Sequence, residues 1–184
     1  MDTNRILIIA MGRSGGYGLG NWISRELNLK FIHEPMINLL NETGNNIVTK
    51  YLITEWEVYD KTPIQRYDKI IGLIREGDRE CAESQCWAER NNKWRNYYSV
   101  SQEWLKENES YISEMEGWVQ RKRESLLNIK ELDLIVSYEG IYNRRDDIKR
   151  LTDFLNIQNP KYLHLFDNSL RLRDTGFKPK KQLI

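Results

Sequence analysis

The sequence predicts an α/β protein in which helices cover both faces of a central, mostly parallel sheet. Two observations lead to this fold class. Short continuous apolar runs, which are typical of strands buried on both faces, alternate along the chain with longer segments of helical periodicity. A glycine-rich stretch separates the first apolar run from the first helical segment. Because strands that alternate with helices are joined by right-handed crossovers, we expect neighbouring strands to be parallel.

The strands are predicted from their apolar runs, beginning with ILIIAM inside residues 5–11. A helix is expected directly after the glycines, because Leu19, Trp22, Ile23 and Leu27 recur with helical spacing. Further strands are expected over residues 30–33, 47–53, 69–74 and 132–137.

Three more helices are predicted farther along the chain. The first covers residues 78–92, and the last carries Ile148, Leu151 and Leu155 on one face before Pro160. Between them, aromatic residues recur every seven positions from Trp104 to Trp118, which indicates a long helix with an aromatic stripe facing the core.

Two details of that long helix are also expected. Ser99 and Gln102 have the spacing of a capping box just before it. Gly117, near its middle, is expected to weaken or kink it, because glycine is a poor helix former.

Composition excludes several classes of protein. The length of 184 residues suits one domain over positions 1–184. The 28 basic and 27 acidic residues give a net charge of +1, so neither nucleic acid nor a membrane surface is the expected partner. No apolar stretch approaches the ~18 residues of a membrane span. We expect a cytoplasmic protein, and the sequence indicates no oligomeric state. Cys81 and Cys86 are too few for a disulfide framework and are expected to be buried thiols.

The glycine-rich stretch predicts an anion-binding site. Four glycines fall within residues 15–20, where bare backbone amides and the positive end of a helix dipole would face a ligand. A Walker A loop is not present, because Asn21 and Trp22 stand where the lysine and the hydroxyl residue belong. The dinucleotide fingerprint also fails after Gly20. Here the cation precedes the glycines: Arg13 can reach a phosphate, and the hydroxyl of Ser14 and the amides that follow supply further donors.

Three segments resemble those of sulfotransferases that use 3′-phosphoadenosine 5′-phosphosulfate (PAPS). GRSGGYGLGNW, residues 12–22, is similar to the family's 5′-phosphosulfate loop. IIGLIREGDRECAES, residues 70–84, resembles its 3′-phosphate segment, an apolar strand that ends in arginine and is followed by a helical serine. LIVSYEGIYNRRDDIKRLTDFLNI, residues 134–157, resembles its strand–Tyr-Glu–helix block. The segments occur in the family's order and span residues 6–157.

The resemblance implies a three-layer fold like that of P-loop NTPases and a nucleotide-binding transferase. Such an enzyme moves the sulfuryl group of PAPS to a hydroxyl or amine of a small-molecule or carbohydrate acceptor, and releases 3′,5′-adenosine bisphosphate (PAP) without a metal. By position, the resemblance implies that Arg13 is the basic residue beside the 5′-phosphate and the bridging oxygen. It assigns the 3′-phosphate to Arg75 and Ser84, and the adenine contact to Tyr138. The residues of the phosphosulfate loop would be Ser14, Gly15, Gly16, Tyr17 and Gly18.

The sequence departs from the family's pattern at several positions. Arg75 and Ser84 are nine residues apart where the family usually has eight, so Arg79 could share the phosphate. Tyr17 stands near the place of an aromatic ring that would face adenine. From 171 to 181 there are five cations and one acid, a segment that either clamps the 3′-phosphate or forms a solvated basic tail.

The candidate bases lie in FIHEP, residues 31–35, just after the second predicted strand. His33 and Glu34 both qualify, and many members of the family use a histidine or a glutamate there. Adjacent residues on extended backbone point to opposite sides, so one is expected to act as base while the other packs or orients. We favour Glu34, because its carboxylate could act as base in a partly desolvated site. Lys50 could position the sulfonate, or be an ordinary surface lysine.

Two other functions fit the same residues. A divergent P-loop nucleotide kinase would explain the glycine-rich loop, but the Gly-Lys-Ser/Thr of that class is missing. A catalytically inactive member that binds a nucleotide would explain the altered loop and the nine-residue spacing.

Overall fold

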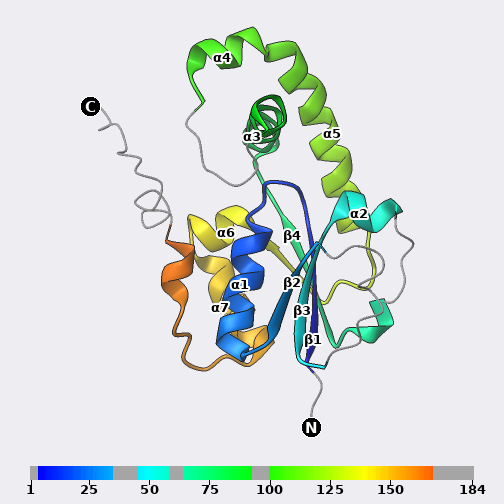
Figure 1. The fold of residues 1–184 in the computed structure, drawn as a ribbon, viewed down its shortest axis with the longest axis vertical. Helices are drawn as coiled ribbons and strands as arrows, with labels where there is room; N and C mark the ends of the chain where they lie inside the picture. The colour runs from blue at the N-terminus through cyan, green and yellow to red at the C-terminus, as the bar shows by residue number, and fades with distance from the viewer. Residues whose placement is uncertain (1–3, 35–44, 59–63, 93–99, 168–184) are drawn as a thin grey trace.

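A parallel five-stranded sheet forms the centre of the molecule, which confirms the predicted fold class. The structure is a computed structural model that describes residues 4–34, 45–58, 64–92 and 100–167 (Figure 1). Its strand order is β2-β3-β1-β4-β5. The strands are β1 (Arg5–Ala10), β2 (Lys30–His33), β3 (Ile47–Leu52), β4 (Lys69–Ile74) and β5 (Leu134–Ser137).

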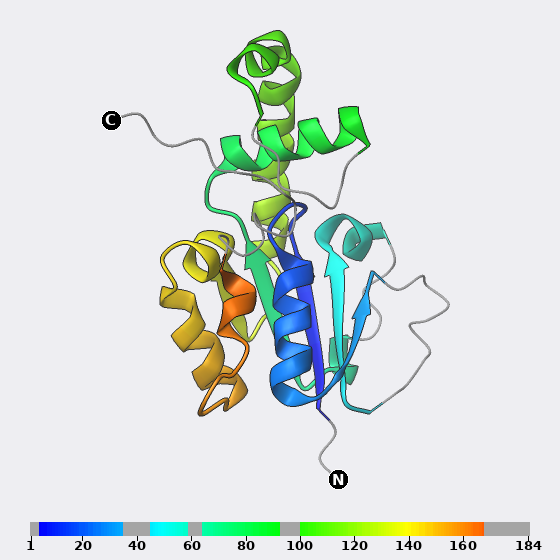
Figure 2. The same ribbon diagram turned by 60° about the vertical axis from the view of Figure 1, so that its left-hand side comes forward.

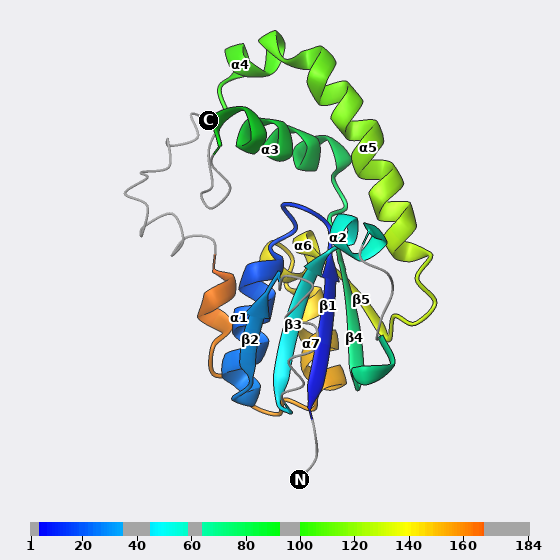
Figure 3. The same cartoon turned by 45° about the vertical axis from the view of Figure 1, so that its right-hand side comes forward.

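Helices occupy both faces of the sheet and the space beyond the carboxyl ends of its strands. They are α1 (Gly16–Leu27), α2 (Ile53–Val58), η2 (Ile64–Arg66), α3 (Asp78–Asn91), α4 (Gln102–Glu107), α5 (Glu109–Leu127), α6 (Tyr138–Tyr142), α7 (Asp146–Leu155) and η3 (Leu163–Phe166). Figures 1 and 2 show α1, α7 and η3 on one side of the sheet, and Figure 3 shows α3, α4 and α5 gathered beyond the carboxyl ends of the strands.

The core consists of two apolar clusters, one on each face of the sheet. Side chains alternate along a strand, so Ile8 of β1 packs with Trp22 and Phe166 on the α1 side. Leu7 belongs to the cluster on the other face, to which Leu126 of α5 contributes. Because β1 is covered on both sides, its continuous apolar run is the pattern that a central parallel strand requires.

The order of the strands reverses at β1. From β1 the chain crosses to β2 and β3 on one side, and from β3 it crosses to β4 on the other. In register, Ile8 of β1 lies between Lys50 of β3 and Ile71 of β4. Open parallel sheets bind their ligands at such a reversal, outside the carboxyl ends of the strands.

The long middle helix differs from the prediction at its start and near its middle, where it is divided at Asn108 into α4 and α5. α5 continues through Gly117, and the expected weakening of the helix there stays a prediction. The N-cap of α4 is Ser101, whose hydroxyl accepts a hydrogen bond from the amide of Trp104 at 3.2 Å. Ser99, the expected cap, lies outside the described residues. The aromatic stripe itself is packed against the core, as expected.

Two further expectations concern the cysteines and the basic C-terminal segment. Cys81 and Cys86 are free and buried, which confirms the expectation. The segment 171–181 lies outside the described residues. In the described part of the chain every helix is either too short or too polar to cross a bilayer.

Candidate active site

The turn between β1 and α1 has a shape that requires glycine at one position. Gly15, the N-cap of α1, has φ +79°, and Arg13 has φ 59°, so both lie in the left-handed region. A Cβ atom on Gly15 would lie 2.6 Å from Cε2 of Tyr142. A side chain at this position would therefore suffer both an unfavourable backbone conformation and a clash.

The helix begins earlier than expected, so three residues predicted as loop form its first turn. Gly16, Tyr17 and Gly18 belong to α1, and its first hydrogen bond runs from the amide of Leu19 to the carbonyl oxygen of Gly15 at 3.1 Å. The three amides before Leu19 therefore have no acceptor within the helix. The first turn contains no acidic side chain, and no side chain caps it. These features fit a bound anion, whose charge the helix dipole favours.

The hydroxyl of Ser14, which was expected to donate to a phosphate, is buried in this structure and donates to the carbonyl oxygen of Met11 at 2.6 Å. The serine thus stabilises the turn that presents the amides. Its contact with a phosphate stays a prediction.

Three predicted residues meet on the β4 side of this turn. Nε of Arg13 donates to the hydroxyl of Ser84 at 3.0 Å. Nη1 of Arg75 donates to the backbone carbonyl of Arg13 at 3.3 Å. The nine-residue spacing therefore still places Arg75 and Ser84 against the same loop, from the end of β4 and the second turn of α3.

The side chain of Arg75 is held on two further sides. Its guanidinium carbon lies 4.9 Å from the centre of the Tyr138 ring, and its Nε lies 3.6 Å from Oε1 of Glu139. Tyr138, the predicted adenine contact, is buried and stacks on Tyr142 with ring centroids 4.7 Å apart. In this structure the ring of Tyr138 supports Arg75 and the Gly15 turn.

Arg79 belongs to a separate cluster. Its guanidinium pairs with Glu83 on α3 and with Glu109 on α5, at 3.0 and 2.6 Å. These hydrogen bonds raise the pKa of Arg79 and connect the two helices.

A buried lysine approaches the turn from the β3 side. Lys50 is only 4% exposed, and its Cε would lie 3.0 Å from a Cβ on Gly16, the first residue of α1. Nζ of Lys50 donates to Oε1 of Glu34. Burial lowers the pKa of Lys50, while the hydrogen bond to Glu34 acts in the opposite direction. The expected alternative of an ordinary surface lysine is therefore wrong.

His33 and Glu34 lie together, although they were expected to point to opposite sides. Glu34 follows the last residue of β2 with φ 46°, and this left-handed turn leaves Nε2 of His33 3.5 Å from Oε1 of Glu34. Glu34 is therefore shared between an imidazole and the ammonium of Lys50.

Tyr17 lies on this side too. Its ring centroid is 5.2 Å from that of His33 and 5.6 Å from that of Phe31, and the residue is 61% exposed. The ring of Tyr17 therefore packs beside β2, at one edge of the sheet.

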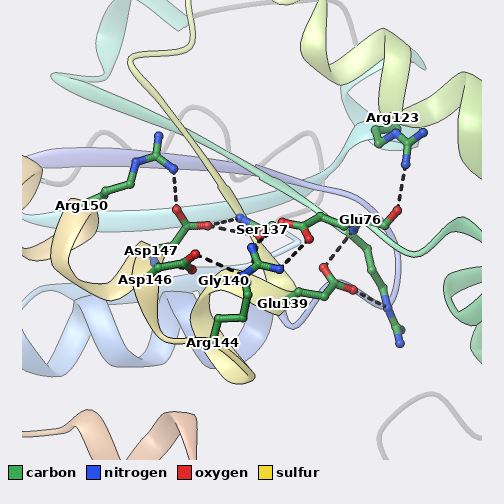
Figure 4. Close-up of polar contacts among 10 residues, drawn as sticks. Glu76, Arg123, Ser137, Glu139, Gly140, Arg144, Asp146, Asp147 and Arg150 are labelled. Carbon is green, nitrogen blue, oxygen red and sulfur yellow. Dashed lines mark hydrogen bonds and ion pairs between the residues drawn. The ribbon is translucent and has the colours of Figure 1, made fainter.

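A polar network that the sequence reasoning missed lies behind Arg75 (Figure 4). Oε2 of Glu139 accepts a hydrogen bond from the backbone amide of Glu76 at 2.9 Å. The carboxylate of Glu76 binds Arg144 through two hydrogen bonds of 2.7 Å, which lower the pKa of Glu76 to about 2. The pair Tyr138-Glu139, directly after an apolar strand, was the available signal, but only its tyrosine was considered.

The fold and the site together define a class of protein. It is a parallel α/β protein in which the N-terminus of the first helix lies beside two arginines at the reversal of strand order, where we expect an anion to bind. A carboxylate–lysine pair lies on the other side of the same helix.

Known structures define the class further. The chain is similar to the mouse sulfotransferase SULT7A1 complexed with PAP, with a TM-score of 0.61 and 18% identity over 98% of this chain and 68% of that one. The protein therefore has a sulfotransferase-like fold. A sugar kinase from Janibacter sp. HTCC2649, solved without ligand, has a TM-score of 0.42 and 13% identity over 85% of this chain and 96% of its own, a score that establishes no common fold. The sequence matches no family model, and it matches none of the curated proteins with which it was compared.

Proposed function

We propose that this protein is a PAPS-dependent sulfotransferase. The observation that carries the proposal is the pairing of two different sets of groups around one helix N-terminus: Arg13, Arg75 and Ser84 on the β4 side, and Glu34 with Lys50 on the β3 side. Transfer between a nucleotide donor and an acceptor needs both an anion site and a proton acceptor. The fold shared with a PAP-bound sulfotransferase supports the same function.

The β4 side would hold the nucleotide. Arg75 and Ser84 would bind the 3′-phosphate, and the first amides of α1 with Arg13 would bind the 5′-phosphate. The left-handed turn at Gly15 and the absence of acidic residues from the first turn of α1 fit such an anion. Tyr138, the expected adenine contact, lies next to Arg75, but its ring is buried and already stacks on Tyr142.

The β3 side would carry the chemistry. When bound, PAPS supplies a sulfuryl group whose S–O bond to the 5′-phosphate breaks, with its electron pair going to the phosphate, as the acceptor oxygen or nitrogen bonds to sulfur. Glu34 takes the proton that this acceptor loses. Lys50, whose Nζ already binds Glu34, places a positive charge beside the first residue of α1 and stabilises the transferring group. His33, in contact with Glu34, orients the carboxylate.

The exposed ring of Tyr17 lies beside this pair and offers a flat surface to an acceptor. A small molecule or a sugar with a free hydroxyl or amine is therefore the expected acceptor class. No metal ion takes part in this proposal.

The proposal is tested by calorimetric titration of the protein with PAP, AMP, ATP and NAD, in the wild type and in Arg75→Ala. We expect PAP to bind most tightly and its advantage over AMP to disappear in the variant. A preference for ATP that Arg75→Ala leaves unchanged would favour a nucleotide kinase instead. PAP binding without transfer from PAPS to any acceptor of a phenol, alcohol, sugar and amine panel would indicate an inactive nucleotide-binding protein.

A further inference from the structure

A carboxylate lies behind the arginine that faces the proposed 3′-phosphate. Glu139 and Arg75 are both mostly buried, at 18% and 13% side-chain exposure, and their closest atoms are 3.6 Å apart. That distance makes the contact an ion pair rather than a hydrogen bond, and Nε of Arg75 has no hydrogen-bond acceptor among the described residues. The carboxylate therefore acts on the guanidinium by its charge and its position.

The contacts of Arg75 fix the direction of its guanidinium. Nε faces Glu139, Nη1 donates to the carbonyl oxygen of Arg13, and the guanidinium lies over the ring of Tyr138. Nη2 has no hydrogen bond to any residue that the structure describes. Nη2 and the second hydrogen of Nη1 are therefore the donors of Arg75 that are left for a ligand on the loop side.

Glu139 is itself held in place. Its second carboxylate oxygen accepts the backbone amide of Glu76 at 2.9 Å, directly after Arg75 in the chain. Glu139 is also the second residue of α6, whose N-cap Ser137 accepts the amide of Gly140 at 2.9 Å. Both the backbone and the side chain of Glu139 are thus fixed.

We propose that Glu139 is a positioning residue: it orients Arg75 toward the loop and thereby sets the preference of the site for a nucleotide with a 3′-phosphate over one without it. This inference rests on the proposed function, because it assigns the 3′-phosphate to Arg75. Arginine loses considerable rotamer freedom when it is ordered, so holding the side chain before the ligand arrives lowers the free-energy cost of binding.

A competing role for the same carboxylate has the opposite sign. If Glu139 only neutralised Arg75 in the empty site, a phosphate would compete with it, and removal of the carboxylate would tighten PAP binding. If Glu139 orients the guanidinium, its removal weakens PAP binding and leaves AMP binding unchanged.

The experiment compares Glu139→Ala, Glu139→Gln and the control Glu76→Gln with the wild type. Glu76→Gln removes one negative charge from the same cluster, and its carboxylate binds Arg144, not Arg75. Dissociation constants for PAP and AMP are measured by calorimetry after circular dichroism has shown that each variant is folded. In parallel, modification of Arg75 by phenylglyoxal without ligand is followed by peptide mass spectrometry.

We expect Glu139→Ala to weaken PAP binding about 10-fold, because the arginine side chain must then be ordered when the ligand binds, with AMP binding unchanged. Glu139→Gln should recover only part of this loss, because its one amide oxygen can accept the amide of Glu76 or face Arg75, whereas the carboxylate does both with separate oxygens. Glu76→Gln should keep the wild-type ratio, and Arg75 should react faster in Glu139→Ala alone.

Three results would overturn the inference: an equal loss of PAP and AMP affinity, tighter PAP binding, or an unchanged rate of Arg75 modification in Glu139→Ala. A wild type that does not prefer PAP to AMP is a failure of the proposed function instead. In that case the modification of Arg75 still decides whether Glu139 holds it.

Discussion

The two sides of the β1–α1 turn present charge in different ways. On the β4 side, Arg75 belongs to a network of ion pairs and hydrogen bonds that continues through Glu139 to Arg144. On the β3 side, Lys50 is nearly buried and has Glu34 as its hydrogen-bonded partner. The contacts on the β4 side fix the direction of the Arg75 guanidinium. On the β3 side, a carboxylate and an ammonium that can each bind or release a proton lie next to each other.

The difference teaches that one helix N-terminus can serve two separable tasks. A network of many partners resists rearrangement and suits recognition of a fixed anion. In a single desolvated ion pair, each group strongly changes the pKa of the other, which suits proton transfer. If this division is correct, substitutions on one side should change nucleotide affinity and substitutions on the other should change the rate of transfer.

The largest expected effect is that of Glu34→Gln on transfer from PAPS. Loss of a general base costs about 100-fold or more in rate, while PAP binding should not change, because Glu34 makes no contact with Arg13, Arg75 or Ser84. Steady-state kinetics and calorimetry on the same preparation measure both quantities. The matched variant His33→Asn should lose less; a greater loss in His33→Asn would make the histidine the base.

A smaller effect is expected on the β4 side from Arg75→Lys. Lysine keeps the charge but has neither the planar fork nor the stacking surface that faces Tyr138, so PAP should bind about 10-fold more weakly. The turnover rate at saturating PAPS should stay close to that of the wild type. Arg79→Lys, which alters an arginine bound to Glu83 and Glu109, is the control and should leave PAP affinity unchanged. Equal losses in both variants would break the division of tasks.

The pH dependence of stability should distinguish the buried lysine. Burial lowers the pKa of Lys50 in the folded protein below 10.5, so between the two values the unfolded chain binds more protons. The free energy of unfolding that Lys50 contributes therefore rises with pH in that range. Urea unfolding of the wild type and Lys50→Met should show that, from pH 8 to 10.5, the free energy of unfolding of the wild type rises relative to that of the variant. The thiol of Cys81, with its pKa raised to about 11, titrates in both proteins and cancels in the comparison. Parallel curves would mean that Lys50 is not desolvated.

The smallest effect is expected from Glu76→Gln under acid conditions. Arg144 lowers the pKa of Glu76 to about 2, so this carboxylate contributes stability that is fully present above about pH 4.5 and is lost as the pH falls toward 2. The two side chains are nearly half exposed, so the contribution is less than about 1 kcal/mol. Thermal unfolding between pH 6 and pH 3 should show a smaller decline for the variant than for the wild type. Identical declines would mean that water screens the pair completely.

Strands were the easiest part of the fold to predict from the sequence. Every strand of the described sheet falls within two residues of a predicted run, because the central strands are buried on both faces and are therefore mostly apolar. The break at Asn108 was missed because apolar spacing continues across it. α5 continues through Gly117, where packing of this helix against α3 offsets the low helix propensity of glycine.

The residues of the candidate site could be predicted from the sequence, but most of the contacts between them could not. Arg13, Arg75 and Ser84 follow the ends of neighbouring strands or lie one helical turn beyond, so the sheet brings them together. The contact between His33 and Glu34 depends on one positive φ that no periodicity reveals. A lysine inside an apolar strand is the signal that could have identified the environment of Lys50. The functional roles of all these residues stay predictions.

The hydroxyl of Tyr142 donates to the carbonyl oxygen of Gly15 at 2.9 Å, across 127 positions of the chain. The glycine turn thus depends for its shape on a helix that is synthesised long after it. We expect the N-terminal segment to emerge from the ribosome with its motif complete but its anion site unformed. Because α6 follows β5, we expect the turn to reach its final shape only after β5 has paired with β4.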